Sequence, residues 1–168
     1  MAIRNLRFEN DEILRKRSKE IEIIDDKIRE LAADMIETVH KYDGLGLAGP
    51  QIGILKRIVV IDLYEPGTQY VLINPEIVRV KGEQEVSEGC LSFPNKFGMV
   101  KRPQEVEVKA LNLDGEEIRI VGTDLLAQAF CHEIDHLNGE VFIDKVEPNT
   151  LEVVTPEGKK ERKEKRKR

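Results

Sequence analysis

The chain has 168 residues, a length typical of one domain or of one domain with a tail. Its 40% hydrophobic and 35% charged residues exclude an intrinsically disordered chain, which has too few apolar residues to form a core. No uncharged apolar stretch approaches the ~18 residues of a membrane span, and no signal-peptide run follows Met1. We therefore expect a cytoplasmic protein with no membrane partner. Its two cysteines, Cys90 and Cys131, form one disulfide at most, which leaves metal binding or catalysis open.

The net charge of −5 is unevenly distributed along the chain. Residues 157–168 carry eight Lys or Arg and three Glu, a net charge of +5, which leaves 19 basic and 29 acidic residues and a charge of −10 for the rest. We predict a folded domain over residues 1–150 and a charged, disordered basic tail over residues 151–168. Contact of the tail with ribosomal RNA is one interpretation, and a solubilising role is the favoured one. We expect no DNA partner.

A first helix is predicted over residues 25–41. Asp25 or Asp26 can cap its start, and Asp43-Gly44 ends it. Apolar residues recur here at the spacing of one helix face, at Ile28, Leu31, Ala32, Met35, Ile36 and Val39. The segment is therefore expected to form an N-terminal amphipathic helix.

Short β-rich runs follow a glycine-rich loop. We predict strands over residues 57–63, 69–74 and 76–81, separated by Pro66-Gly67 and by Pro75. Residues 105–111 alternate apolar and charged side chains, and Asp114-Gly115 then turns the chain into residues 117–121. This pattern is a strong hairpin signal.

The last predicted element is a helix over residues 124–138. Thr123 or Asp124 can cap it, and Gly139 follows its end. Its apolar residues surround nearly the whole helix, as in the core of a domain: Leu125, Leu126, Ala129, Phe130, Ile134 and Leu137. The expected class is α+β, with mainly antiparallel sheets packed around this C-terminal helix.

Residues 132–136 form an HExxH sequence in that helix. Residues four apart share a helix face, so His132 and His136 can reach one metal ion with Glu133 beside it. Coordination also satisfies imidazole nitrogens that an apolar helix would leave unpaired. The alternative, two histidines hydrogen-bonded within the core, is weaker because two of the three histidines in the chain lie here.

A catalytic zinc-like site usually has three protein ligands and one open position. A later Glu ligand would have to come from the tail region, and no histidine follows His136. Cys90 is the better third ligand, because Gly89 permits close backbone approach and Pro94 ends the segment, so a strand end or turn can present the thiolate. Cys131 points off the ligand face and is expected to pack in the core.

Three separated blocks together resemble the peptide deformylases: GLGLAGPQIG over residues 44–53, EGCLS over 88–92 and HEIDHL over 132–137. The resemblance covers about residues 3–148 and implies a catalytic domain of this type over residues 1–150. Gly49 departs from the family pattern, which usually has a second alanine there. The implied reaction removes the formyl group from the N-terminal formyl-methionine of newly made polypeptides, with N-formyl-methionyl peptides and nascent chains as partners.

The resemblance also implies the ligands and their roles. It places one divalent ion on Cys90, His132 and His136, with Fe²⁺ as the native ion and Zn²⁺ or Ni²⁺ able to substitute, although this donor set alone suits several metals. Hydroxide formed at the metal attacks the formyl carbon, and Glu133 takes the water proton and passes it to the leaving amine. Two further groups are assigned to the charge that develops on the formyl oxygen: the Gln51 side-chain amide and the Leu91 backbone N–H.

Helix spacing predicts a pocket for the methionine side chain. Ala129, Gln128 and Leu125 lie three, four and seven positions before His132, so they share the helix face of the metal ligands. Leu45 and Val86 can close the pocket. The alternative for Leu125 and Ala129 is plain core packing.

The peptide backbone is expected to pair with Leu45, Gly46 and Gly89 as an added strand. Glu88 is counted with the substrate-binding residues, and it is expected to pair with Arg102 and so hold the Cys90 segment. Two other functions use part of this pattern: a zincin-type endopeptidase with a different third ligand, and a structural metal site in an RNA- or ribosome-binding module. Both are less favoured, because the three blocks together are more specific than HExxH alone.

Overall fold

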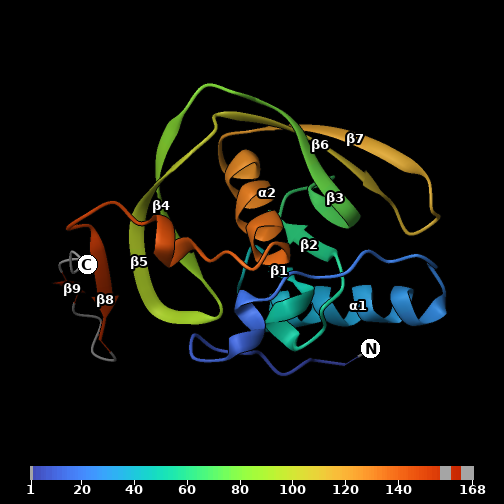
Figure 1. Ribbon diagram of the computed structural model, residues 1–168, viewed down its shortest axis with the longest axis horizontal. Coiled ribbons are helices and arrows are strands. Elements are labelled where there is room, and N and C mark those ends of the chain that lie inside the picture. The colour runs from blue at the N-terminus through green and yellow to red at the C-terminus, as the bar shows by residue number, and fades with distance from the viewer. Residues whose placement is uncertain (1, 156–159, 164–168) are drawn as a thin grey trace.

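The computed structural model describes residues 2–155 and the backbone of residues 160–163 (Figure 1). This part of the chain contains two α-helices, three short 3₁₀ helices and nine strands. The helices are α1 (Asp26–Lys41), α2 (Asp124–Leu137), η1 (Glu12–Arg15), η2 (Gly49–Ile52) and η3 (Phe142–Lys145). The strands are β1 (Gly46–Ala48), β2 (Ile58–Asp62), β3 (Gln69–Lys81), β4 (Gln84–Cys90), β5 (Phe93–Arg102), β6 (Glu105–Leu111), β7 (Glu117–Thr123), β8 (Leu151–Val154) and β9 (Lys160–Lys163). The predicted α+β class is confirmed.

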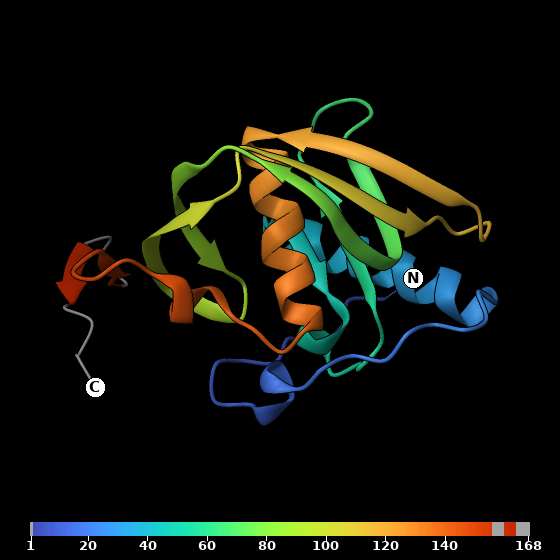
Figure 2. The same ribbon diagram turned by 45° about the horizontal axis from the view of Figure 1, so that its top comes forward.

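The strands form two antiparallel sheets around α2. One sheet has the order β1-β2-β3-β6-β7 and the other the order β4-β5-β8-β9. Strand β3 leads almost directly into β4, and β5 into β6, so a long ribbon bends over α2 from one sheet to the other (Figures 1 and 2). Helix α2 therefore lies between the sheets, as the sequence predicts for an apolar helix.

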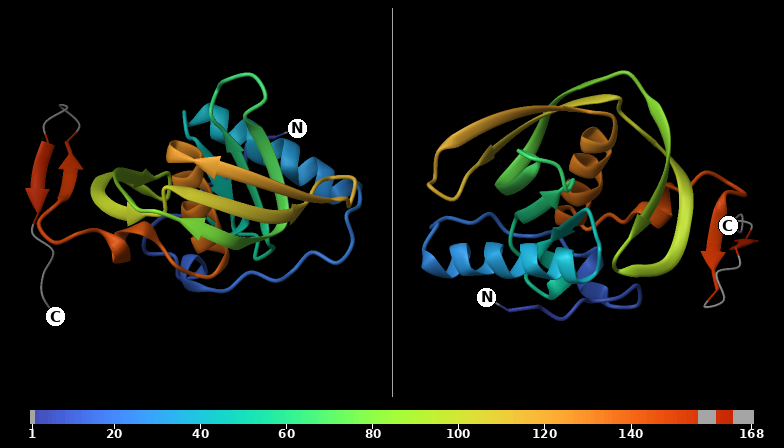
Figure 3. Two further views of the ribbon diagram at one scale, coloured as in Figure 1. Left: turned by 90° about the horizontal axis from the view of Figure 1, so that it is seen from above. Right: turned by 180° about the vertical axis from the view of Figure 1, so that it is seen from behind.

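Strand β2 is buried on both faces and divides the main core in two. Its Val59 and Ile61 pack in the cluster that contains Phe130 of α2. Its Ile58 and Val60 pack in the cluster formed with α1. Burial on both faces explains why this strand consists of consecutive apolar residues rather than alternating ones. The viewpoints of Figure 3 show α1 and the β4-β5 region at opposite ends of this core.

Both long helices end in the same hydrogen-bonding pattern. At the end of α1, Asp43 has φ 52° and the Gly44 N–H donates to the Val39 carbonyl at 2.9 Å. At the end of α2, Gly139 has φ 76° and the Glu140 N–H donates to the Asp135 carbonyl at 2.9 Å. These are Schellman ends, in which a left-handed residue follows the helix. The predicted stops at Asp43-Gly44 and Gly139 are confirmed, as is the cap at Asp25, whose side chain accepts from the Ile28 N–H.

Two features of the sheets differ from the sequence prediction. Pro75 does not separate two strands, because β3 runs through it with a register shift between Ile73 and Glu76. A bulge tolerates proline, which has no N–H to give to the ladder. Strands β4 and β5 were not predicted, since their sequences mix polar residues with Pro94 and Gly98 and lack a clean alternation.

The chain beyond residue 150 also differs from the predicted disordered tail. Strand β8 pairs with β5, with Val153 opposite Lys96, and β9 pairs with β8. The run Leu-Glu-Val-Val has the β-branched residues that favour pairing with an open sheet edge. The remaining tail positions, 156–159 and 164–168, lie outside the described residues.

No helix among the described residues has the length and apolar character needed to cross a membrane.

We expect Gly139→Ala to lower the free energy of unfolding more than Gly67→Ala. Both glycines have left-handed backbones, with φ 76° and 77°, where a side chain costs about 1–2 kcal/mol. At Gly139 an added Cβ would also lie 2.5 Å from the Arg15 carbonyl oxygen, whereas at Gly67 no described atom lies within 4 Å. Urea unfolding of both variants measures the difference, and equal losses would contradict the close packing at Gly139.

Candidate metal centre

Three donor side chains meet between α2 and the end of β4. His132 and His136 lie one turn apart on α2, with ring centroids 5.0 Å apart, and Cys90 is the last residue of β4. One ligand atom from each of the three residues lies within 4.8 Å of the other two, and Cys90 Sγ is 3.3 Å from His136 Nε2. The structure thus brings together all three predicted metal ligands.

The donor set fits a divalent metal ion. Bonds of ~2.1 Å to nitrogen and ~2.3 Å to sulfur separate two ligands of a tetrahedral ion by roughly 3.4–3.7 Å. The 3.3 Å between Cys90 Sγ and His136 Nε2 is close to that range. Burial lowers the pKa of His136 well below its usual value, which keeps the imidazole in the neutral form that binds metals.

The turn between β4 and β5 presents the thiol. Cys90 ends β4, Phe93 starts β5, and these two residues pair across the turn after a shift of register. An added Cβ at Gly89 would lie 2.7 Å from the ring of Phe97, its partner on β5, so this ring occupies the space that a side chain at position 89 would need. The predicted presentation of Cys90 from a strand end agrees with this geometry.

Glu88 orients His132 from behind. Its carboxylate accepts from His132 Nδ1 at 2.8 Å and from Arg102 Nε at 3.0 Å. Burial acts to raise the pKa of Glu88, but the bonds from His132 and Arg102 outweigh it and lower the pKa to about 2. Because Nδ1 is held by Glu88, Nε2 of His132 is left for a metal. The predicted Glu88–Arg102 pair is present, and both residues are buried, each 4% exposed.

Glu133 lies beside the ligands with one oxygen unbonded. Its side chain is buried, and its Oε1 has no hydrogen-bond partner among the described residues. Burial raises the pKa of Glu133 to about 7. A carboxyl group with such a pKa can both accept and return a proton near neutral pH. On the open side, an added Cβ at Gly46 would lie 2.6 Å from Glu133 Oε2, so β1 passes close to this carboxylate.

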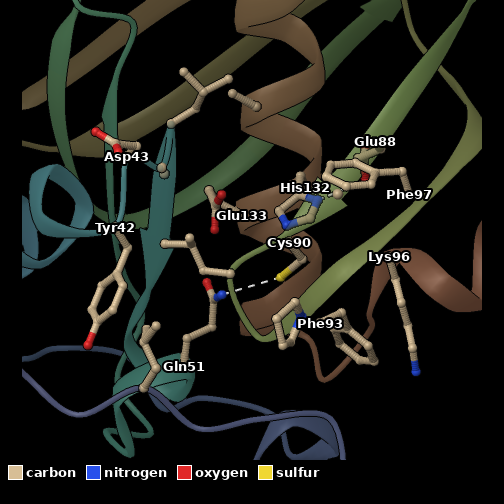
Figure 4. A pocket seen from close by; sticks show the side chains of 18 of the residues that line it. Tyr42, Asp43, Gln51, Glu88, Cys90, Phe93, Lys96, Phe97, His132 and Glu133 are labelled. Carbon is tan, nitrogen blue, oxygen red and sulfur yellow. Dashed lines mark hydrogen bonds and ion pairs between the residues drawn. The ribbon is translucent and has the colours of Figure 1, made fainter. Parts of the chain in front are cut away.

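Gln51 is held by the helix η2 with its amide directed at the centre. Its Oε1 accepts from the Ala48 N–H at 2.9 Å, which fixes the side-chain orientation. Its Nε2 donates to Ser92 Oγ at 3.1 Å. The same nitrogen lies 3.4 Å from Cys90 Sγ, and a dashed line marks this contact in Figure 4. Leu91 lies in the turn between β4 and β5 and lines the same space.

Gly49, which departs from the family pattern, lies at the start of η2. An added Cβ there would lie 2.6 Å from the Lys56 carbonyl oxygen and 2.7 Å from that of Ile54. In this chain the loop that carries Gln51 therefore packs too tightly for a second alanine.

Cys90 and His132, with Glu133 beside them, line a cleft of about 790 Å³. Most of the predicted substrate-binding residues line it: Leu45, Gly46, Glu88, Gly89, Leu125, Gln128 and Ala129. Leu125 is 45% exposed, which excludes the alternative that it is plain core. Ala129 is buried in the core cluster and also borders the cleft, so both interpretations hold for it.

Val86 is the one predicted pocket residue that the structure does not bring to the cleft. It lies on β4 opposite Val100, two residues before Glu88. Its neighbours Ser87 and Glu88 line the cleft, so the part of β4 that borders the cleft begins one residue after Val86. The prediction for Val86 was based on the spacing of residues in the last helix, which carries no information about the position of a strand such as β4.

Other cleft residues were missed by sequence reasoning. Some come from the N-terminal arm and some from the β5 end, and these are Leu6, Phe8, Phe93, Pro94, Asn95, Lys96 and Phe97. Tyr42 and Asp43, at the end of α1, also line the cleft. Tyr42 and Asp43 could have been found from their position directly before the glycine-rich block. The other residues reach the cleft through contacts between segments distant in sequence, for which the sequence gave no signal.

Sequence comparison connects this site with known proteins. The model of the polypeptide deformylase family matches residues 3–152. The peptide deformylase of Acetivibrio thermocellus is 55% identical over 146 residues, which cover 87% of this chain and 85% of that protein. Peptide deformylase 2 of Clostridium acetobutylicum is 52% identical over 147 residues, which cover 87% of this chain and 97% of that protein.

Solved structures share the fold. The crystal structure of a peptide deformylase from Legionella pneumophila matches with a TM-score of 0.84 and 44% identity over 88% of both chains. A peptide deformylase from Synechococcus elongatus, in complex with actinonin, matches with a TM-score of 0.82 and 44% identity over 85% of this chain and 78% of that one. Sequence and fold agree over nearly the whole of the described domain, and this chain therefore belongs to the polypeptide deformylase family.

Proposed function

We propose that this protein is a metal-dependent hydrolase that removes the formyl group from N-formyl-methionyl peptides and nascent chains in the cytoplasm. The observation that carries the proposal is the convergence of Cys90, His132 and His136 beside a buried Glu133 with an unbonded oxygen. Family membership supports the same reaction. Hydrolysis breaks the formyl C–N bond, adds water across it and releases formate and a free amine.

The three ligands would hold one divalent ion, and we propose Fe²⁺ as the native ion, with Zn²⁺ or Ni²⁺ able to replace it. When bound, such an ion supplies Lewis acidity and lowers the pKa of water at its open position. The chain contributes the neutral imidazole of His136 and the orientation of His132 by Glu88. The iron assignment rests on the family resemblance, because a thiolate with two imidazoles suits several metals.

Glu133 moves the proton. Its Oε1 is buried and unbonded among the described residues, so it is free to accept a proton from the attacking water. With a pKa of about 7, the protonated carboxyl group is then acidic enough to pass the proton to the leaving amine. The same residue serves as base and acid, which a carboxylate of ordinary pKa would do less well.

Two groups are proposed to donate hydrogen bonds to the formyl oxygen as charge develops on it. The Gln51 amide is fixed by its bond from Ala48 and presents Nε2 beside Cys90. The bond from this nitrogen to sulfur is weak, so we infer that Nε2 exchanges it for the stronger charge-assisted bond to the oxyanion. The backbone N–H of Leu91, in the turn after Cys90, is the second proposed donor.

The substrate backbone is proposed to add to β1. This strand is the edge of its sheet, and the Leu45 carbonyl already accepts from the Asp62 N–H at 2.8 Å. In an antiparallel pair the next residue directs its N–H and carbonyl to the opposite side, which makes Gly46 the open pairing residue. Pairing there lays the peptide along Gly46 and Gly89, with the methionine side chain toward Leu125, Gln128 and Ala129.

The parent protein, purified anaerobically, should release formate from formyl-Met-Ala-Ser and contain close to one metal ion per chain. Glu133→Gln should keep that metal content and lose turnover by at least about a thousandfold, because the amide cannot accept the proton. A formate assay with elemental analysis of each sample measures both. Parent-like turnover in Glu133→Gln would contradict the general-base role.

Cys90→Ala should lose the metal and the activity together, whereas Cys131→Ala should keep both. Cys131 lies on the ligand helix α2 itself, where it is buried in the core, and burial raises its thiol pKa to about 11, so it stays a neutral packing group. Metal content after gel filtration provides the comparison. Retention of metal in Cys90→Ala, together with cleavage of internal bonds in casein, would instead favour a zincin-type endopeptidase.

Gly46→Ala should reduce turnover by at least about tenfold with the metal retained, because the new methyl group would press on Glu133 Oε2 at 2.6 Å. Gly67→Ala, in the loop after β2, has open space around its Cβ and serves as the control. The measurement is kcat for formate release beside metal content. Equal activity in the two variants would refute the close approach of β1 to the carboxylate.

A further inference from the structure

The loop after β2 reaches the backbone at the rim of the cleft. The Tyr64 hydroxyl donates to the Gly44 carbonyl oxygen at 2.6 Å. Gly44 connects α1 to the edge strand β1, and it lines the cleft together with Leu45 and Gly46. A side chain from outside the cleft thus bonds directly to the segment that leads into the proposed peptide-binding strand.

Tyr64 is itself held in place by its neighbours. Its backbone is left-handed, with φ 61°, and its N–H donates to Asp62 Oδ1 at 2.7 Å. His40 Nε2 lies 2.6 Å from Asp62 Oδ2, and the His40 and Tyr64 rings are 5.5 Å apart. The bond to His40, with that from the Tyr64 N–H, holds the pKa of Asp62 below its usual range, so the carboxylate stays an acceptor. A non-glycine residue keeps such a backbone only where its surroundings fix it.

The segment that Tyr64 contacts is fixed on its other sides by packing and backbone bonds. Gly44 donates to the Val39 carbonyl, and an added Cβ would lie 2.7 Å from the Leu91 side chain. The Leu45 carbonyl accepts from the Asp62 N–H. The backbone of Asp62 therefore bonds to Leu45 and its side chain to the Tyr64 N–H, so Asp62 links the two segments.

We propose that Tyr64 is a positioning residue for peptide binding: its hydroxyl fixes the Gly44 carbonyl and thereby sets the position of the open edge at Gly46. The inference rests on the proposed function. The Tyr64 side chain is on the surface, with the residue 52% exposed, so burial of its ring contributes little to stability. Its hydroxyl bond acts on the rim of the cleft and does not reach the groups assigned to proton transfer, so the expected effect is on binding.

Tyr64→Phe isolates this bond, because it keeps the ring and the backbone and removes only the hydroxyl. Tyr70→Phe is the matched control: Tyr70 lies on β3 of the same sheet and packs edge-on against Phe130 in the core. Loss of one net hydrogen bond predicts a rise of about three- to tenfold in KM for formyl-Met-Ala-Ser with Tyr64→Phe, with kcat within about twofold of the parent. Tyr70→Phe should leave both constants within about twofold of the parent.

Substrate length supplies a second readout that a merely structural role would not move. Formyl-methionine has no downstream residues to pair along β1, so its KM should rise less in Tyr64→Phe than that of the tripeptide. Thermal unfolding of both variants serves as a check on folding. An active parent with Tyr64→Phe indistinguishable from Tyr70→Phe, or with a loss confined to kcat, would overturn the positioning role alone. A parent that releases no formate would overturn the proposed function and this inference with it.

Discussion

The buried ion pair between Glu88 and Arg102 is the interaction on which the site depends. Each residue is 4% exposed, and burying two charges is costly unless several bonds compensate them. Glu88 also accepts from His132, and Arg102 also donates to Asp135 at 2.8 Å. These bonds join β4, β5 and α2, so the four-stranded sheet is fixed to the HExxH helix. Because Cys90 follows Glu88 by two residues, the same bonds carry its thiol to the histidines.

Helix α2 combines core packing and chemistry by using different faces. Phe130 and Leu137 are completely buried against the five-stranded sheet, while His132 and Glu133 face the cleft. Ordering both faces in one rigid helix fixes the spacing of the functional groups without help from a loop. Burial has a second consequence, since removal of water from around Glu133 raises its pKa to about 7. The packing that stabilises the fold therefore also adjusts the acidity that the proposed reaction requires.

The accuracy of the sequence prediction depended on whether the interactions were local. Helix spacing is local, so the α2 boundaries and the shared face of His132 and His136 could be predicted. Strand pairing is not local: β4 and β5 have no clean alternation, so neither strand could be predicted from the sequence. Pro75 indicated a break that the bulge in β3 absorbs. The pairing of β8 with β5 was also not predictable, because the sequence does not show that β5 has a free edge at which another strand can pair.

The glycine-rich blocks 44–53 and 88–92 bring backbone to the cleft, whereas the HExxH block brings side chains to it. Added Cβ atoms would lie 2.7 Å from Leu91 at Gly44, 2.6 Å from Glu133 Oε2 at Gly46 and 2.7 Å from Phe97 at Gly89. At these three positions the backbone therefore lies so close to neighbouring side chains that no Cβ atom fits. In the proposed binding mode, an extended peptide needs exposed N–H and carbonyl groups to pair with, and it needs them close to Glu133. Glycine meets both requirements, so the proposed binding mode depends on the glycines beside the cleft as well as on the HExxH helix.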